Sequence, residues 1–229
     1  MLCYAISIQR ARKHQMTAAA SNGYSNRTQA PTDEHTTPKS TTIPKNITPD
    51  GRHLLKTPFV LWFMHREPGR RVENYESAMI KVGAFATVEE FWGLYSRLKR
   101  PNDLPSISDI LLFRRGTRPV WEDNPKGGKW IVRLKKGLAS RYWEQLVLAV
   151  IGDSFDVGGE ISGAVLSIRH SEDILSLWNL SANEGRVNLR IRDTMKKMLD
   201  LPPNCTMEYK AHLNSIGDGS SFKNTEMYR

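Results

Sequence analysis

Cysteine and long apolar runs are both scarce in this sequence. Its 229 residues include 2 cysteines, Cys3 and Cys205. Two are too few for a disulfide scaffold or a cysteine-rich metal site, and they fit a reducing compartment. No apolar run approaches the roughly 20 residues that a membrane-spanning helix needs. We therefore expect a soluble, intracellular protein that does not enter a membrane.

The motifs of common catalytic and metal sites are also missing. The segment GGKW at 127–130 lacks the upstream Gly and the following Ser or Thr of a P-loop, and no GxSxG, HExxH or Cys/His cluster occurs. The 6 His residues show no ligand spacing, and no nucleophile stands beside a base. These absences favour a protein that is not an enzyme and that uses no metal and no cofactor.

Positive charge and a sufficient apolar fraction are what the sequence does have. Lys and Arg number 33 against 24 Asp and Glu, a net charge of +9, and 39% of the residues are hydrophobic. This apolar fraction is enough for a core. A basic balance favours an anionic partner, although it says nothing of the fold.

The first 52 residues differ from the rest in composition. They hold no Trp, many Thr, and prolines at positions 31, 38, 44 and 49. Such a stretch cannot repay the entropy of ordering, so we predict a disordered N-terminal tail over 1–52. The less favoured alternative is a mitochondrial transit peptide, since no acid precedes Asp33. Translation from Met16 instead of Met1 stays open. One domain over 53–215 and a flexible C-terminal segment over 216–229 complete the predicted organisation.

Strand and helix patterns alternate within the predicted domain. Alternating apolar residues predict strands over 59–66, 75–85, 109–115, 130–136, 161–170, 173–180 and 206–212. Helices are predicted near 87–99, with a Thr87–Glu90 capping box, over 140–152, with Ser140 as N-cap, and over 184–200, with Ile191, Met195 and Met198 inward. Antiparallel strands with three helices over one face predict an α+β domain.

Tryptophan is abundant in this domain. Trp62, Trp130 and Trp143 lie on apolar faces and are predicted to fill the core. Trp121 differs, because it stands between an Arg-Pro turn and a Pro/Gly-rich loop and is followed by Glu122 and an Asp. A ring beside a carboxylate suits a flat, cationic ligand with N–H donors along one edge. Guanine methylated at N7 is such a ligand, and its phosphates would need Lys or Arg nearby.

These residues lie in segments that resemble the eukaryotic translation initiation factor 4E family, whose members bind the 5′ cap of mRNA. The matching segments run from His53 to His212: LWF (61–63), TVEEFWGLYS (87–96), PVWEDNPKGGKWIVRL (119–134), GAVLSIR (163–169) and LPPN (201–204). Others are closest to the 4E-homologous protein subclass: RPNDL (100–104), KKGLASRYWE (135–144), IRDT (191–194) and MEYKAH (207–212). The resemblance implies a curved antiparallel sheet backed by three helices on its convex face, with the cap-binding pocket on the concave side.

The resemblance also implies roles for individual residues in that pocket. Trp121 and Tyr75 would stack on the methylated guanine, Glu122 would read its edge, and Trp178 would lie against the N7-methyl group. Lys129, Arg133 and Arg169 fall at or near positions that contact the phosphates. Tyr75 replaces the Trp of most members and is typical of the 4E-homologous subclass.

Two departures from the family pattern imply weaker cap binding. Ile174 stands where general initiation factors carry a phosphate-contacting Lys. The segment after His212 has no clear match to a further basic residue of the family, and Lys223 is the candidate substitute. A Tyr face in place of a Trp face should also weaken the stacking, by about 1 kcal/mol or less.

A second surface is predicted on the helices. At 100° per residue, Trp92 lies off the buried stripe of the first helix, and Leu148 lies opposite that of the second. In the family this surface receives a partner helix with a Tyr-x-x-x-x-Leu-Φ motif, and the resemblance assigns it His53, Val88, Trp92 and Leu148. Leu54 replaces the usual Pro after His53, and Glu144-Gln145 replaces a Leu-Glu pair. These changes imply poor binding of the scaffold that recruits ribosomes.

Together these features predict a monomeric cytoplasmic protein that binds capped mRNA, through 7-methylguanosine triphosphate, and partner proteins. Its predicted role is to repress selected mRNAs by competing with the general cap-binding initiation factor. The alternative is a specialised initiation factor that recruits the scaffold through Trp92. An enzyme of cap metabolism would need metal-binding carboxylates or a nucleophile, and neither is evident in the sequence.

Overall fold

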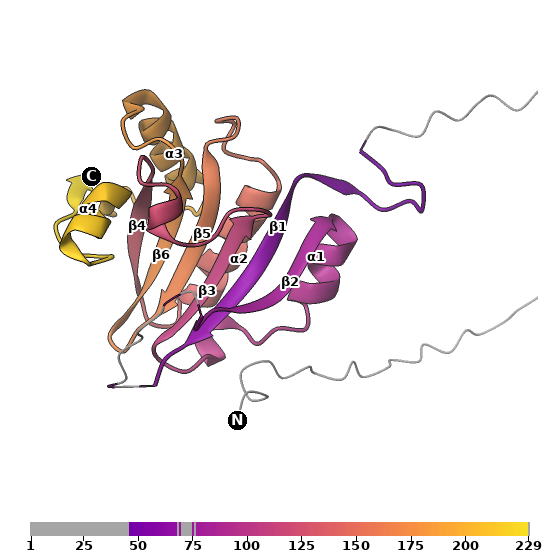
Figure 1. The fold of residues 1–229 in the computed structure, drawn as a ribbon, viewed down its shortest axis with the longest axis horizontal. Helices are drawn as coiled ribbons and strands as arrows, with labels where there is room; N and C mark the ends of the chain where they lie inside the picture. The colour runs from indigo at the N-terminus through magenta and orange to yellow at the C-terminus, as the bar shows by residue number, and fades with distance from the viewer. Residues whose placement is uncertain (1–45, 68, 70–74, 76, 229) are drawn as a thin grey trace, which may run out of the picture.

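A curved antiparallel sheet forms the centre of the computed structural model, which describes residues 46–67, 69, 75 and 77–228 (Figure 1). In the described chain it has eight strands: β1 (Leu54–His65), β2 (Ile80–Thr87), β3 (Ser108–Arg114), β4 (Gly128–Lys135), β5 (Ile161–Ile168), β6 (Glu172–Asn179), β7 (Met207–Ala211) and β8 (Glu226–Tyr228). Their order across the sheet is β2-β1-β3-β5-β6-β4-β7-β8. All neighbouring pairs are antiparallel, so the strands bring together segments that are distant in the chain.

Helices cover the convex face of this sheet, as the predicted α+β class requires. They are α1 (Val88–Tyr95), α2 (Ala139–Ile151) and α3 (Gly185–Met198). A further short helix, α4 (His212–Asp218), follows β7 at one end of the sheet (Figure 1). Two 3-10 turns, η2 (Pro101–Asp103) and η3 (Trp121–Asp123), lie in loops. No helix in the described residues combines the length and the apolar content needed to cross a bilayer.

The first turns of two helices are held in different ways. At α1 the Thr87 hydroxyl accepts a hydrogen bond from the Glu90 backbone N–H at 3.2 Å, so the predicted cap is present. The Glu90 carboxylate accepts from the backbone N–H of Ala86 at 2.8 Å. The predicted cap of α2 is wrong, because Leu138 is the N-cap residue and Ser140 lies inside the helix. The Ser140 N–H, otherwise unpaired at a helix start, donates to the side-chain oxygen of Asn102 in η2 at 3.2 Å.

The main core lies between the sheet and α1–α3. Trp130 and Trp143 are both 1% exposed there, as predicted. The Trp130 indole N–H donates to the Asn188 carbonyl at 3.1 Å, which satisfies its one donor. In β4 the alternation predicted for Trp130, Val132 and Leu134 is observed, since all three are buried on this side.

Two residues expected in this core lie elsewhere. Trp62 is partly buried and packs on the opposite face of the sheet, because Leu61 and Phe63 on either side of it take the face toward the helices. Met198 is 39% exposed, and Leu199 is buried in its place. The reason is that α3 ends at Met198, so the residue after the last turn, not the last helical residue, faces the core.

The ends of the described chain have more regular structure than was predicted. Ile47 forms a β-bridge with His53, and Arg52 N–H donates to the Thr48 hydroxyl at 2.8 Å, so structure begins before residue 53. Residues 1–45 of the predicted tail lie outside the described residues. At the other end, α4 crosses the boundary predicted at 215, and β8 pairs with β7 inside the segment predicted to be flexible.

Candidate functional site

A cavity of about 480 Å³ opens on the sheet face away from the main core. Alternation along the strands creates it: in β6, Leu175 and Leu177 point into the main core, while Ser176 and Trp178 line the cavity. Of the seven residues predicted for the pocket, six line this cavity: Tyr75, Trp121, Glu122, Lys129, Arg169 and Trp178. They come from β4, β6, the η3 turn and the residues beside β2 and β5, so only the folded sheet brings them together.

The η3 turn presents a ring and an unpaired carboxylate to the cavity. Trp121 opens the turn and Glu122 follows it, and both line the cavity. The next acid, Asp123, is bound by Arg118 through its Nε at 2.8 Å, and this ion pair holds the pKa of Asp123 below its usual value. Within the described part of the chain, Glu122 forms no ion pair, so its two oxygens remain free to accept hydrogen bonds from a ligand.

Trp178 is buried to 6% exposure at the cavity wall. Its ring packs edge-on against Phe113, with centroids 5.2 Å apart, and at a tilt against the imidazole of His212, with centroids 4.5 Å apart. His212 Nδ1 is 2.8 Å from the Asn124 carbonyl oxygen, which requires a proton on that nitrogen. Burial lowers the pKa of His212 to about 4, so the ring is neutral at pH 7 and supports Trp178 without adding charge.

Lys129 is the most enclosed cation of the cavity. Its side chain is almost fully buried, with residue exposure of 1%, and its Nζ donates to the Ser221 hydroxyl at 3.1 Å. The same atom lies 5.4 Å from the Trp121 ring centroid, 5.6 Å from that of Trp178 and 5.1 Å from that of Phe222. Cations are attracted to aromatic faces at these distances, so Lys129 is held between three rings.

Arg169 and Tyr75 complete the opposite wall of the cavity. Arg169 donates to Asp109 at 2.7 Å and to two backbone carbonyls, Ser108 at 3.1 Å and Ile168 at 3.0 Å, so its guanidinium is fixed in position. Tyr75 is 38% exposed at the rim, and burial of its hydroxyl raises its pKa, so the phenol stays protonated. The fixed guanidinium of Arg169 suits an anion. The neutral ring of Tyr75 suits a flat ligand.

Arg133, the seventh predicted residue, does not line the cavity. Its Nε donates to Glu208 and its Nη1 to Glu172, both at 2.6 Å, and these two carboxylates raise its pKa. Ile174, paired with Arg133 across β4 and β6, is buried and brings no charge. Lys223 also lies outside the lining, and its carbonyl accepts a hydrogen bond from Lys210.

The residues predicted for a partner surface lie on α1, on α2 and just before β1. The three apolar residues of this set are exposed on α1 and α2: Val88 at 37%, Trp92 at 43% and Leu148 at 38%. The Trp92 ring packs edge-on against Phe91 at 4.9 Å, which fixes its position without covering it. His53 is tied to the start of α1, since its Nδ1 lies 2.7 Å from Glu89 Oε1 and its carbonyl accepts from Val88 N–H at 2.9 Å.

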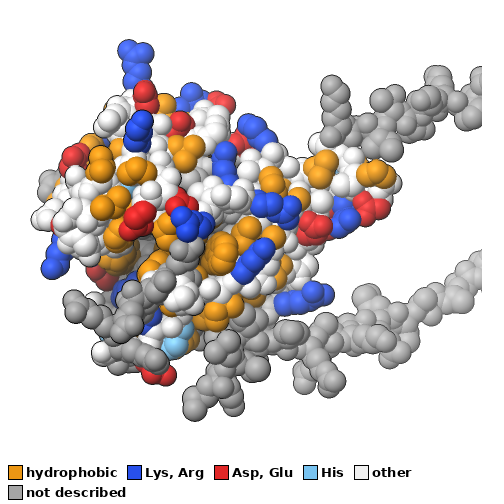
Figure 2. Space-filling model, in the orientation of Figure 1, with side chains coloured by type: hydrophobic (Ala, Val, Ile, Leu, Met, Phe, Trp, Pro, Cys, Tyr) orange, Lys and Arg blue, Asp and Glu red, His pale blue; other side chains and the backbone are white. Residues whose placement is uncertain are grey.

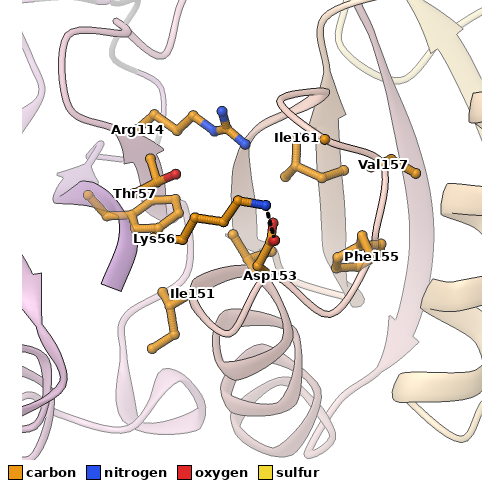
Figure 3. A pocket seen from close by; sticks show the side chains of 11 residues that line it. Lys56, Thr57, Arg114, Ile151, Asp153, Phe155, Val157 and Ile161 are labelled. Carbon is orange, nitrogen blue, oxygen red and sulfur yellow. Dashed lines mark hydrogen bonds and ion pairs between the residues drawn. The ribbon is translucent and has the colours of Figure 1, made fainter. Parts of the chain in front are cut away.

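A smaller pocket near the end of α2 is unsuited to a ligand. Figure 3 shows Lys56 reaching across it to Asp153, with which it forms an ion pair, while Phe155 and Ile161 point inward. Its volume of about 10 Å³ is of the order of one water molecule. It contains none of the predicted site residues.

The surface charge does not by itself locate the site. In the face shown in Figure 2, Lys and Arg side chains are scattered among acidic and hydrophobic ones and do not gather into one basic patch. The residues that sequence reasoning missed are Phe222 and Ser221 of the C-terminal segment and the supporting His212 and Lys210. Lys210 alone carried a signal, because a lysine stands in the middle of the predicted strand 206–212.

The fold and site define a class of protein: a curved sheet whose concave side holds aromatic rings, a free carboxylate and basic side chains. The model of the family described as "Eukaryotic initiation factor 4E" matches residues 54–227. The chain therefore belongs to the eukaryotic initiation factor 4E family.

Individual relatives agree with this assignment. The chain is 48% identical over 177 residues to the eukaryotic translation initiation factor NCBP of Oryza sativa subsp. japonica, covering 76% of this chain and 78% of that protein. It is 46% identical over 176 residues to the eukaryotic translation initiation factor 4E-4 of Caenorhabditis elegans, covering 76% and 83%. These relatives are consistent with a 4E-homologous protein.

Solved structures show the same fold. Ascaris suum eIF4E-3 in complex with the m7G cap superimposes with a TM-score of 0.68 at 35% identity, covering 77% of this chain and 97% of that chain. C. elegans eIF4E-3, in complex with the 4E-binding protein Mextli and a cap analog, gives 0.69 at 33% identity, covering 76% and 99%.

Proposed function

We propose that this chain binds the 7-methylguanosine 5′ cap of mRNA in the cavity between η3, β4 and β6. The observation that carries the proposal is the pairing of the Trp121 ring with the unpaired Glu122 carboxylate at one cavity wall. N7 methylation makes guanine a cation and leaves N1–H and N2–H as parallel donors, which match a ring face and a carboxylate. Relatives of known structure that bind m7G caps support the choice of ligand.

The remaining cavity residues suit the other parts of this ligand. Tyr75 at the rim would cover the second face of the base, and Trp178 would lie against the N7-methyl group. Lys129 and Arg169 would face the phosphates. Arg133 is the weakest member of the proposed set, because Glu172 and Glu208 already neutralise it. A triphosphate would have to break one of these ion pairs to engage it.

For the role in the cell, we propose repression of selected mRNAs by competition with the general cap-binding initiation factor. Two observations around the predicted partner surface support weak binding of the ribosome-recruiting scaffold. Leu54 is 42% exposed where the family usually has Pro. Glu144, which replaces an apolar residue, forms an ion pair with Arg100 and so presents a polar group beside Leu148 on α2.

The second candidate role is that of a specialised initiation factor which recruits the scaffold. The exposed Trp92 favours it, since the scaffold's helix with a Tyr-x-x-x-x-Leu-Φ motif would need such a ring to bind. Both roles describe a cytoplasmic, non-catalytic monomer that binds capped mRNA and one partner helix. Co-purification of the scaffold with the wild type but not with Trp92→Ala would favour initiation, and its absence from both would favour repression.

Cap binding is tested by titrating the chain with 7-methyl-GTP and with GTP while following Trp fluorescence. Because a desolvated cation–π contact is worth about 2 kcal/mol, we expect 7-methyl-GTP to bind about tenfold or more tighter, with quenching. Equal affinity for the two nucleotides would contradict the proposal.

A further inference from the structure

Two buried lysines face each other beside the cavity. Lys129 of β4 and Lys210 of β7 are directly opposite in the antiparallel register, and each is 1% exposed. Residues opposite each other in this way point to the same face of the sheet, where like charges repel. Burying an ammonium group is also costly unless an anion compensates it. The pair therefore needs counter-charge.

Within the described residues, only one of the two lysines forms an ion pair. Lys210 Nζ forms an ion pair with Asp218 of α4 at 2.6 Å and donates to the carbonyls of Ser220, at 3.0 Å, and Lys223. These three acceptors use all of its donors. Lys129, by contrast, has the Ser221 hydroxyl and three ring faces, and it forms no ion pair with a carboxylate in the described chain.

The other charged groups around the cavity do not compensate Lys129. Asp109 of β3 and Arg169, which follows β5, form an ion pair with each other, and Arg66 lies 3.6 Å from the same carboxylate. His212 of α4, beside Trp178, is neutral at pH 7 because burial lowers its pKa. Glu122 of η3 lines the same cavity without an ion pair to Lys129.

We propose that Lys129 and Lys210 form an under-compensated pair whose missing negative charge is supplied by the ligand's phosphates, so that cap binding is coupled to uptake of a proton by Lys129. This inference rests on the proposed function, and it adds that proton uptake accompanies cap binding. The Lys210–Asp218 ion pair is part of the arrangement, because Asp218 is bound to Lys210 and offsets the charge of Lys210 on Lys129 only in part.

The direction of the pH effect follows from the free and bound states. In the free protein, burial and then the charge of Lys210 lower the pKa of Lys129 to about 7. A bound phosphate raises that pKa. Binding therefore takes up a proton at pH values between the pKa of Lys129 in the free protein and its pKa in the complex. At pH 8, above this pKa, most of Lys129 is neutral before binding, so binding takes up as much as one proton per ligand. An arginine at this position would stay charged throughout.

The test is calorimetric titration of the full chain with 7-methyl-GTP at pH 8, in two buffers of different ionisation enthalpy, for wild type and Lys129→Arg. The N1–H of 7-methylguanine and the terminal phosphate also exchange protons, but they contribute equally in both proteins. We expect the wild type to take up close to one proton more than the variant. Between pH 6.5 and pH 8, the affinity of the wild type for 7-methyl-GTP should fall by a factor about five to ten times larger than that of Lys129→Arg.

A second variant keeps the inference testable if Lys129→Arg does not fold, as judged by near-UV circular dichroism. Lys210→Gln removes the repelling charge and releases Asp218, so proton uptake at pH 8 should drop well below that of the wild type. Binding with the same proton number in wild type and variants would overturn the inference and leave cap binding intact. Failure of every protein to bind 7-methyl-GTP at either pH would instead overturn the proposed function.

Discussion

The two faces of the sheet are built from the same strands and yet have opposite properties. On the convex side, Trp130 and Trp143 are sealed under helices at 1% exposure among apolar neighbours. On the concave side, Trp121 and Phe222 are only partly buried around a cavity that also holds charged groups. Because side chains alternate along each strand, one residue packs in the core and the next points to the cavity face of the sheet. Substitutions on the two faces should therefore separate unfolding from loss of ligand.

The largest effect is expected on the convex side, where Trp143→Ala removes a ring from the closed core. Such truncations leave a cavity and lower the free energy of unfolding by about 3–5 kcal/mol. Urea unfolding followed by circular dichroism measures this. The matched control is Trp92→Ala, which truncates an exposed ring 43% accessible to solvent and should change stability far less. Equal losses in the two variants would break the proposed contrast between the sealed and the exposed tryptophan.

Next in size is the effect of Trp92→Ala on partner binding. An exposed Trp that anchors a helix is a typical interface hot spot, and its loss should weaken a Tyr-x-x-x-x-Leu-Φ peptide by about 2 kcal/mol or more. Peptide titration by calorimetry measures the change, with 7-methyl-GTP affinity as the internal control, since the proposed cap-binding cavity lies on the other face of the sheet. A variant that loses both activities would mean that Trp92 supports the fold.

On the concave side, Glu122→Gln should weaken 7-methyl-GTP binding by about 1.5–3 kcal/mol, because the guanine edge loses a charged acceptor. Asp123→Asn offers a control within the same turn, since the Asp123 carboxylate is already bound to Arg118 and is not assigned to the guanine edge. Fluorescence titration of both variants checks the difference. If Asp123→Asn proved the more damaging, the assignment of the edge-reading carboxylate would be wrong.

The smallest effect is expected for Tyr75→Trp at the cavity rim. A larger ring stacks better on a cation, so 7-methyl-GTP affinity should rise by about 1 kcal/mol or less. GTP, which lacks the cation, should gain less, and the ratio of the two affinities is the informative measurement. A gain that was the same for both nucleotides would indicate simple apolar contact and not cation stacking.

Periodicity and local signals predicted the class of the fold and most of its elements. Alternating apolar residues located seven of the strands, and the Thr87 cap located the start of α1. Trp62 was misplaced because a continuous apolar run does not reveal which residues face the helices. Met198 was misplaced because the position at which a helix ends decides which of its last residues faces the core. The short α4 and β8 were missed because they depend on contacts distant in sequence, such as His212 with Asn124 and β8 with β7, more than on their own patterns.

The residues of the candidate site also divide into those that the sequence could predict and those that only the folded structure reveals. Trp121 and Glu122 were found from the residues around them, and family resemblance added Tyr75, Lys129, Arg169 and Trp178, all of which line the cavity. Phe222 and Ser221 could not be found, because nothing local distinguishes an aromatic residue in a Ser/Gly-rich segment from any other. Arg133 matched by position, but its availability depends on Glu172 and Glu208, which only the register of the strands reveals.

The order of the strands has a consequence for how the protein folds. The cavity joins Arg66, which follows β1, to Phe222, which precedes β8, and β4 pairs with both β6 and β7. Such distant pairings raise contact order and form late, after local helices and hairpins. A chain stalled part-way through folding would hold helices and much of the core, yet it would lack the wall that Lys210 and Asp218 position. Retention on cap resin would therefore report on completed folding of the whole sheet, from its first strand to its last.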